Sequence, residues 1–200
     1  MIRAINAIAS YGVDAYSSNV TAFWSGGRRE VIVKSQPQVE YDYLFEAAGP
    51  GCTYVFKQPL MGEIQRQVRE RWSDIQAVTL HDWFCYAYAR ANGYNWFIDP
   101  VPSMLYRQHE SNQVGINSGL PAFKKRFAKV TDGWWLSQAL IIAQLVGMKD
   151  HVFVRSWSRR DRFNLAALAL SSHKCRRRVR DKFIFSIFCL ILAILPGRRA

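Results

Sequence analysis

"LHDWFCYAYARANGYNWFIDPVPSMLYRQHESN" (residues 80–112) is the stretch that decides the fold of this chain. Its first part predicts a helix over residues 82–92, because Trp83, Ala87 and Ala91 share one helical face and a glycine follows as a stop. The runs "WFIDPV" and "SMLYRQH" predict two strands around a proline-containing turn. A helix followed by strands indicates an α/β order.

The sequence before this stretch extends the alternation of strands and helices. "AYSSNVTAFW" and "REVIVKS" are β-prone runs separated by the turn-rich "SGGR", which predicts a hairpin. "GEIQRQVRERW" predicts a polar helix with Ile64, Val68 and Trp72 on one stripe. The fold class is therefore α/β.

Two glycines precede the β-prone end of "GPGCTYVF". Gly49 and Gly51 would let the backbone pass close to a ligand, since glycine has no Cβ. The alternative is a plain tight turn before a strand.

The chain begins with "MIRAINAIASYG", which predicts a helix closed by Gly12. Ile2, Ile5 and Ile8 recur at helical spacing, and no capping residue precedes the helix. One interpretation is that the sequence starts inside an element whose beginning is missing, and the other is a short native helix that frays. The stretch lacks the sustained apolar run of a secretory signal.

Composition indicates a globular protein with a hydrophobic core, since half of the 200 residues are apolar. The cysteines show no metal-ligand spacing, which favours a reducing cytosolic compartment. Charge is uneven: residues 149–200 carry 13 Lys and Arg against three Asp, whereas residues 1–148 carry 14 basic residues against 12 acidic ones. The basic tail predicts an anionic partner, either phosphate-bearing lipid or nucleic acid.

Residues 119–200 read as a basic, apolar helical tail. The apolar run 183–195 is too short to cross a bilayer, which takes about 20 residues, but it can lie in a membrane interface beside the basic "KCRRRVRDK". We expect association with an anionic membrane surface; the alternative is a helix packed on the rest of the protein with its arginines in solvent. Nucleic-acid binding is suggested by charge alone, and we expect no nucleic-acid partner.

Within residues 80–112, Asp82 and His109 are the candidates for a role in catalysis or metal binding. A carboxylate in the first turn of a helix is favoured by the helix dipole, so Asp82 is explained by capping as well as by catalysis. His109 at the end of a strand is explained equally by a hydrogen-bonded surface histidine.

The order of "AYSSNV", "YDYLFEAAGPGCTYVF", "HDWF" and "YRQHESNQVG" resembles the second half of a family 2 glycosyltransferase. The subgroup it is most similar to builds bacterial O-antigen and other surface polysaccharides, and many of its members are rhamnosyltransferases. The resemblance covers residues 1–118 and implies a GT-A type nucleotide-diphospho-sugar transferase sandwich. It also implies inverting transfer, with rhamnose from a deoxythymidine-diphosphate donor as the expected sugar, to a lipid-linked saccharide acceptor at the cytoplasmic face of the bacterial inner membrane.

The same resemblance implies roles for individual residues. Asp82 matches the catalytic base, which removes the acceptor proton as the oxygen attacks the anomeric carbon. His109 matches a position near the diphosphate or its metal, Mg²⁺ or Mn²⁺, and Arg107 would neutralise a phosphate. The resemblance assigns the remaining matched positions to donor or acceptor binding: Gly51, Cys52, His81 and Trp83. Trp83 would form the apolar floor of the sugar site, and the alternative is a tryptophan of the hydrophobic core.

The sequence departs from this family in one respect. Its members carry a nucleotide-binding first half and an Asp-x-Asp metal motif before the segment that resembles "AYSSNV", and this sequence shows neither. We therefore expect an N-terminally truncated enzyme with little or no transfer by this chain alone, because the leaving diphosphate would lose its main charge stabilisation. The alternative function is a non-catalytic module that binds a membrane or a partner.

Overall fold

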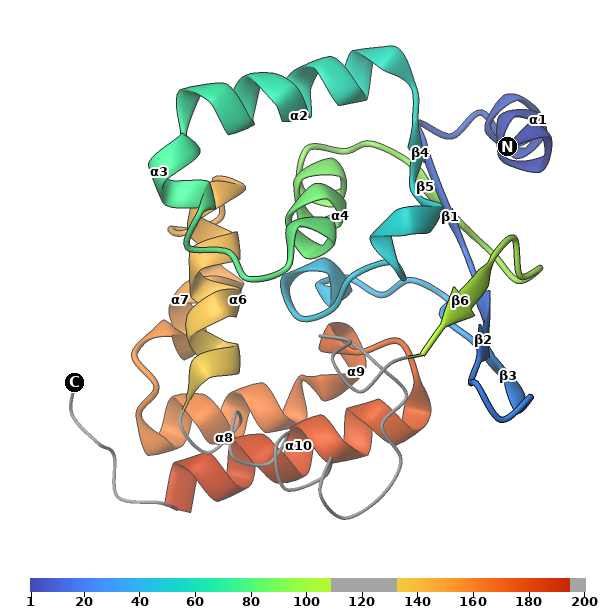
Figure 1. The fold of residues 1–200 in the computed structure, drawn as a ribbon. Helices are drawn as coiled ribbons and strands as arrows, with labels where there is room; N and C mark the ends of the chain where they lie inside the picture. Colours follow the sequence, from blue (N-terminus) through green and yellow to red (C-terminus); the bar gives the residue numbers. More distant parts are fainter. Residues whose placement is uncertain (109–132, 195–200) are drawn as a thin grey trace.

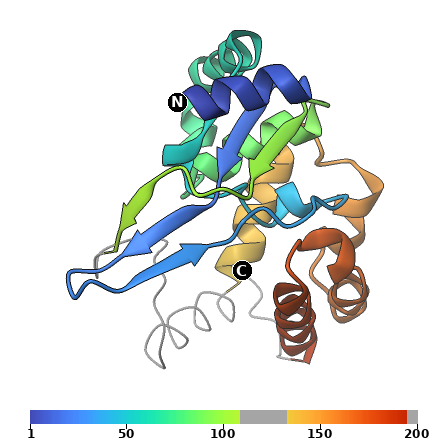
Figure 2. The same ribbon diagram turned by 90° about the vertical axis from the view of Figure 1, so that its right-hand side faces the viewer.

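The computed structural model describes residues 1–108 and 133–194 as a mixed α/β fold (Figure 1). Strands and short helices from the first part lie on one side, and helices from the second part lie against them (Figure 2). The predicted α/β class is confirmed.

The first sheet is built around β1 (Ala15–Ser18) and has the order β4-β1-β5. β5 (Trp96–Asp99) runs parallel to β1, and β4 (Val55–Phe56) runs antiparallel to it. β1 is buried throughout, so its run of small and apolar residues lies between the layers. Its parallel pairing with β5 requires a crossover connection, which the helices between the two strands supply.

The second sheet has the order β3-β2-β6 and contains the predicted hairpin. β2 (Val20–Phe23) pairs antiparallel with β3 (Arg29–Ile32) and parallel with β6 (Leu105–Arg107). One residue, Asn19, separates β1 from β2. Its amide oxygen accepts from the N–H groups of Lys34 and Ser35, and its amide nitrogen donates to the Pro100 carbonyl. Asn19 therefore fixes the segment after β3 beside the junction of the two sheets.

The helices of the first part differ in detail from the prediction. The helix bounds are α1 (Ile2–Tyr11), α2 (Gln58–Glu70), α3 (Trp72–Ile75) and α4 (His81–Ala91), with short 3₁₀ turns η1 (Asp42–Leu44) and η2 (Gly51–Thr53). The predicted stripe through Trp72 is wrong, because α2 ends before Arg71 and the Trp72 side chain is exposed. In α1, Ala4 and Ala7 face the sheet, whereas Ile2 and Ile5 point to solvent.

Five described helices form the second part: α6 (Trp134–Leu145), α7 (Val152–Ser158), α8 (Arg162–Leu170), α9 (Ser172–Cys175) and α10 (Val179–Ile194). α8 and α10 lie side by side (Figures 1 and 2). None of the described helices is both long and apolar enough to cross a membrane.

One hydrophobic core joins the two parts of the chain. Phe45, which follows η1, packs its ring against Trp135 of α6, Trp157 of α7 and Phe185 of α10. The buried cluster contains residues from Ala15 to Ala193. The predicted boundary between residues 1–118 and 119–200 lies outside the described residues and stays a prediction.

Candidate functional site

Asp82 lies in the first turn of α4 and is half-buried. Leu80 precedes the helix in an extended conformation and supplies no side-chain cap. The Asp82 carboxylate accepts a hydrogen bond from the Trp83 backbone N–H at 2.9 Å. The capping interpretation is thus partly correct, since this carboxylate satisfies one of the helix N–H groups that have no intrahelical partner.

Burial raises the pKa of Asp82, and backbone N–H groups and Lys34 oppose that rise without cancelling it. Desolvation disfavours the charged carboxylate because the surrounding protein solvates it less well than water does. Its negative charge also acts on its neighbours: burial and then Asp82 raise the pKa of the Cys85 thiol to about 11. Cys85 therefore stays a neutral thiol at neutral pH.

Gly51 touches Asp82 directly. A Cβ placed on Gly51 would come within 2.9 Å of the Asp82 Cβ, a distance that real side chains do not tolerate. The backbone of η2 and the start of α4 therefore approach one another only because residue 51 is glycine. This contact brings together Gly51, Cys52 and Asp82, three of the residues that the sequence assigned to one site.

Lys34 is a site residue that the sequence did not indicate. Its stem lies 3.6 Å from the Cβ position of Gly49, whose φ of 148° is a conformation that favours glycine. Burial lowers the pKa of Lys34, and its amine also interacts with Glu46, Arg177 and Arg176. Among the described residues, the structure gives Lys34 no ion pair with an acid. The contacts of Asn19 and Gly49 hold this lysine within electrostatic range of Asp82, and such contacts between distant segments leave no signal in its strand-like sequence context.

The other predicted residues lie at different depths. Trp83 is 3% exposed and donates its indole N–H to the Tyr43 carbonyl at 2.8 Å, which matches the interpretation as a core tryptophan. His81 directly precedes Asp82 in the sequence and is exposed. Cys52 is also exposed, and it follows Gly51, the residue that touches Asp82. Arg107 ends β6 in the second sheet, where it pairs with Phe23 of β2. His109 lies outside the described residues.

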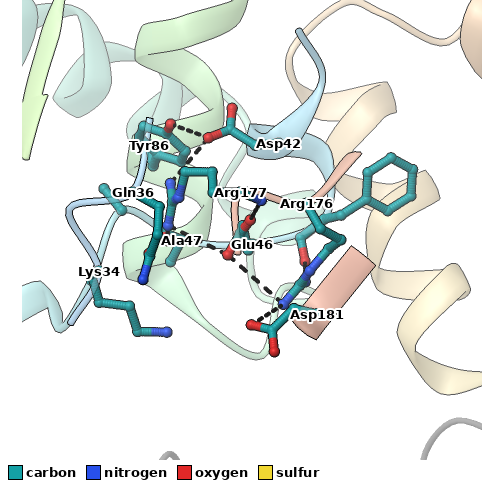
Figure 3. A network of polar contacts seen from close by, with 12 residues as sticks. Lys34, Gln36, Asp42, Glu46, Ala47, Tyr86, Arg176, Arg177 and Asp181 are labelled. Atoms are coloured by element: carbon teal, nitrogen blue, oxygen red, sulfur yellow. Dashed lines mark hydrogen bonds and ion pairs between the residues drawn. The ribbon is translucent and has the colours of Figure 1, made fainter. Parts of the chain in front are cut away.

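Asp42 and Glu46 form a buried network with the arginines of the tail (Figure 3). Asp42 accepts hydrogen bonds from the Tyr86 hydroxyl at 2.7 Å and from Arg177 at 3.1 Å. Arg177 also donates to the Ala47 carbonyl, and its backbone N–H donates to Glu46. Burial raises the pKa of Asp42, while the guanidinium groups of Arg177 and Arg90 act in the opposite direction.

Two arginines of the basic run "KCRRRVRDK" take part in this network. Arg177 is fully buried, and Arg176 pairs with Glu46 and Asp181. Two of the tail arginines therefore hold the tail to the first part of the chain. The Arg177 side chain is closed to solvent, and the Arg176 side chain is 20% exposed.

The described residues do not form a metal site. No group of three histidine, cysteine, aspartate or glutamate side chains converges within residues 1–108 and 133–194. Asp82 is surrounded by glycine backbone and by neutral thiols rather than by further carboxylates.

A curated protein shares most of this sequence. The chain is 41% identical over 192 residues to the dTDP-rhamnosyl transferase RfbG of Shigella flexneri. The chain is related to a rhamnosyl transferase. The match covers 96% of this chain but 65% of that relative, so the chain spans just under two thirds of its relative's length. No family model matches the chain. No solved structure matches it either.

This relationship supports the resemblance to glycosyltransferases over nearly the whole chain rather than over the quoted motifs alone. The mixed α/β fold with small sheets and many helices is compatible with part of a nucleotide-sugar transferase. Membership of family 2, the GT-A arrangement and the individual site residues are matters of proposal.

Proposed function

We propose that this chain takes part in inverting glycosyl transfer from a nucleotide-diphospho-sugar, with dTDP-rhamnose as the donor suggested by the relative's name. A GT-A type arrangement of family 2 is the expected context. The observation that carries the proposal is the approach of the Gly51 backbone to Asp82, which fixes a half-buried carboxylate with a raised pKa at the start of α4. Perturbed carboxylates held in this way are frequent in catalytic sites.

Asp82 acts as the general base in this proposal. The acceptor hydroxyl oxygen forms a bond to the anomeric carbon, and its proton passes to the Asp82 carboxylate. The bond between the anomeric carbon and the diphosphate oxygen breaks, and the nucleoside diphosphate leaves with the electron pair. The carboxylate also stabilises the positive charge that develops on the sugar ring during transfer.

Lys34 supplies positive charge on the same side of the molecule. A phosphate group near its amine would restore the charged form that burial disfavours, because an opposite charge raises a lysine pKa. We therefore assign Lys34 to the donor diphosphate. Mg²⁺ or Mn²⁺ stays part of the proposal through His109, together with Arg107 as a phosphate ligand and His81 and Cys52 as donor or acceptor contacts. A lipid-linked saccharide is the proposed acceptor.

A donor hydrolysis assay tests the role of Asp82 without knowledge of the acceptor. Purified chain is incubated with dTDP-rhamnose, and the release of dTDP is followed by chromatography. We expect slow release by the wild-type chain and release at the uncatalysed rate by Asp82→Asn. Asp150→Asn is the matched control, because Asp150 is exposed in the turn before α7. Equal rates for the wild-type chain and Asp82→Asn would contradict the proposed base.

Calorimetric titration with dTDP, with and without Mn²⁺, tests donor binding separately. We expect Lys34→Gln to weaken dTDP binding, because it removes a charge while keeping a similar stem. A folded protein that binds no dTDP under either condition would favour the alternative function, a non-catalytic module that binds a membrane or a partner. The exposed apolar face of α10 is the observation behind that alternative.

A further inference from the structure

Helix α10 has two apolar faces. Phe185, Cys189 and Ala193 are buried, and the helix packs along α8. A second set of large apolar side chains is exposed by 46–77%: Val179, Phe183, Ile187, Leu190 and Ile194. These five residues are spaced by four, four, three and four positions, so they form one stripe along the helix, opposite the buried face.

Helix α8 adds two further exposed side chains of this kind. Phe163 is 88% exposed and Leu170 is 82% exposed, and their separation of seven residues places them on one face of the helix. Leu165 and Leu168 of the same helix are buried against the core. Single exposed apolar residues are ordinary in soluble proteins, but a stripe over the full length of a helix marks an interaction site.

Basic side chains accompany these apolar residues. Arg178 and Arg180 are exposed at the start of the α10 stripe, and Arg159 and Arg162 are exposed next to Phe163 in the sequence. Two acidic residues lie among these arginines: Asp181 pairs with Arg176 and Arg180, and the exposed Asp161 caps α8 next to Arg162 in the sequence. With Arg177 buried against Asp42, these exposed arginines form the basic part of the surface that an anionic partner would meet.

We propose that the exposed faces of α8 and α10 dock onto the headgroup region of an anionic lipid bilayer. The apolar stripe would enter the boundary between headgroups and acyl chains, and the arginines would pair with lipid phosphates. Two copies of the chain that met through this surface would bring their arginines together, which disfavours a dimer as the occupant. Because the apolar stripe follows the length of α10, the helix would lie along the bilayer surface. The docking surface is independent of glycosyl transfer.

Vesicle co-sedimentation of the full chain tests this surface. The vesicles are phosphatidylcholine alone or phosphatidylcholine mixed with phosphatidylglycerol, each at low and high salt. We expect binding to the mixed vesicles that weakens as salt rises, because mobile ions screen the arginines from the lipid phosphates. Absence of binding by the folded wild-type chain at low salt would overturn the proposal.

Two variants identify the residues that bind. Ile187→Gln with Leu190→Gln removes the middle of the stripe, and we expect vesicle binding to weaken by about tenfold or more. Arg178→Gln with Arg180→Gln leaves every buried contact of α10 in place, and we expect a loss of about fivefold for each arginine together with a smaller salt dependence. The charge variant tests the surface even where the apolar variant fails to fold.

Ile2→Gln with Ile5→Gln is the matched control, because these two side chains are equally apolar and exposed but lie on α1. We expect its vesicle binding to equal that of the wild type. Equal losses for the α1 and α10 variants would overturn the assignment to α10. Sedimentation velocity without lipid tests whether a second copy of the chain covers this surface instead. A wild-type dimer that dissociates in the Ile187→Gln with Leu190→Gln variant would overturn the membrane proposal and identify the surface as a dimer interface.

Discussion

At the scale of single residues, Gly51 controls the position of Asp82. Alanine at residue 51 would place a Cβ 2.9 Å from the Asp82 Cβ, so η2 or the start of α4 must move. We expect Gly51→Ala to destabilise the chain by about 1–3 kcal/mol, as overpacking does, and to abolish dTDP release from dTDP-rhamnose. Urea unfolding and the hydrolysis assay measure the two effects.

Gly62→Ala provides the matched comparison for that substitution. Gly62 lies inside α2, and a Cβ there would meet no other atom within 4 Å. Alanine should therefore stabilise the helix by about 0.5–1 kcal/mol and leave the hydrolysis rate unchanged. If Gly51→Ala left stability and the hydrolysis rate as Gly62→Ala does, the close approach of Gly51 to Asp82 would not be needed for the reaction.

The raised pKa of Asp82 predicts the pH dependence of the same residue. The base works only when ionised, so the rate should fall with decreasing pH at a higher pH than for an ordinary aspartate. Because the folded state holds this proton more tightly than the unfolded state does, the ionised carboxylate costs stability above the raised pKa. Asp82→Asn should therefore be at least as stable as the wild type at neutral pH, as thermal unfolding would show. A large loss of stability would instead identify Asp82 as a structural cap.

At the scale of elements, Arg177 links the segment before α10 to the segment around η1. Its guanidinium group contacts Asp42, Glu46 and the Ala47 carbonyl, and its removal would leave a buried carboxylate with one charged partner fewer. We expect Arg177→Met to cost about 3–5 kcal/mol in the free energy of unfolding.

Arg178→Met tests whether this loss is specific to the buried position. Arg178 is the next residue in the sequence, and it is exposed. We expect its substitution to change stability by less than about 0.5 kcal/mol. Similar losses in urea unfolding for the two methionine variants would mean that the network around Asp42 does not anchor the tail.

At the scale of the whole molecule, the core requires both parts of the chain. Phe45 packs against Trp135, Trp157 and Phe185, so a chain that ends at residue 132 would expose Phe45 and the apolar face of α4. We expect that shortened chain to aggregate or to lack a cooperative unfolding transition, whereas a chain that ends at residue 194 should unfold as the full chain does. Near-ultraviolet circular dichroism during heating distinguishes the two. Cooperative unfolding of the chain that ends at residue 132 would show that the first part folds by itself.

The sequence by itself determined many of the elements and supplied candidate site residues. Helical periodicity located α1, α2 and α4, and β-prone runs located the hairpin and β5. The resemblance of the motifs named Gly51 and Asp82 as candidates, and the structure brings these two residues into contact. These signals are local, because they depend on spacing within one segment and on the conformations that glycine and proline allow.

Only the tertiary structure decided which residues face one another. Asn19 and Gly49 hold Lys34 within electrostatic range of Asp82. Arg177, which belongs to the basic run expected beside a membrane, is the buried partner of Asp42. Trp72, which the helical stripe placed inside, lies in solvent because α2 ends at Glu70, two residues before it. Contacts between segments far apart in the chain depend on how layers pack. Spacing within a segment determines which side chains share one face of a helix or strand. The packing of the whole fold determines what that face contacts.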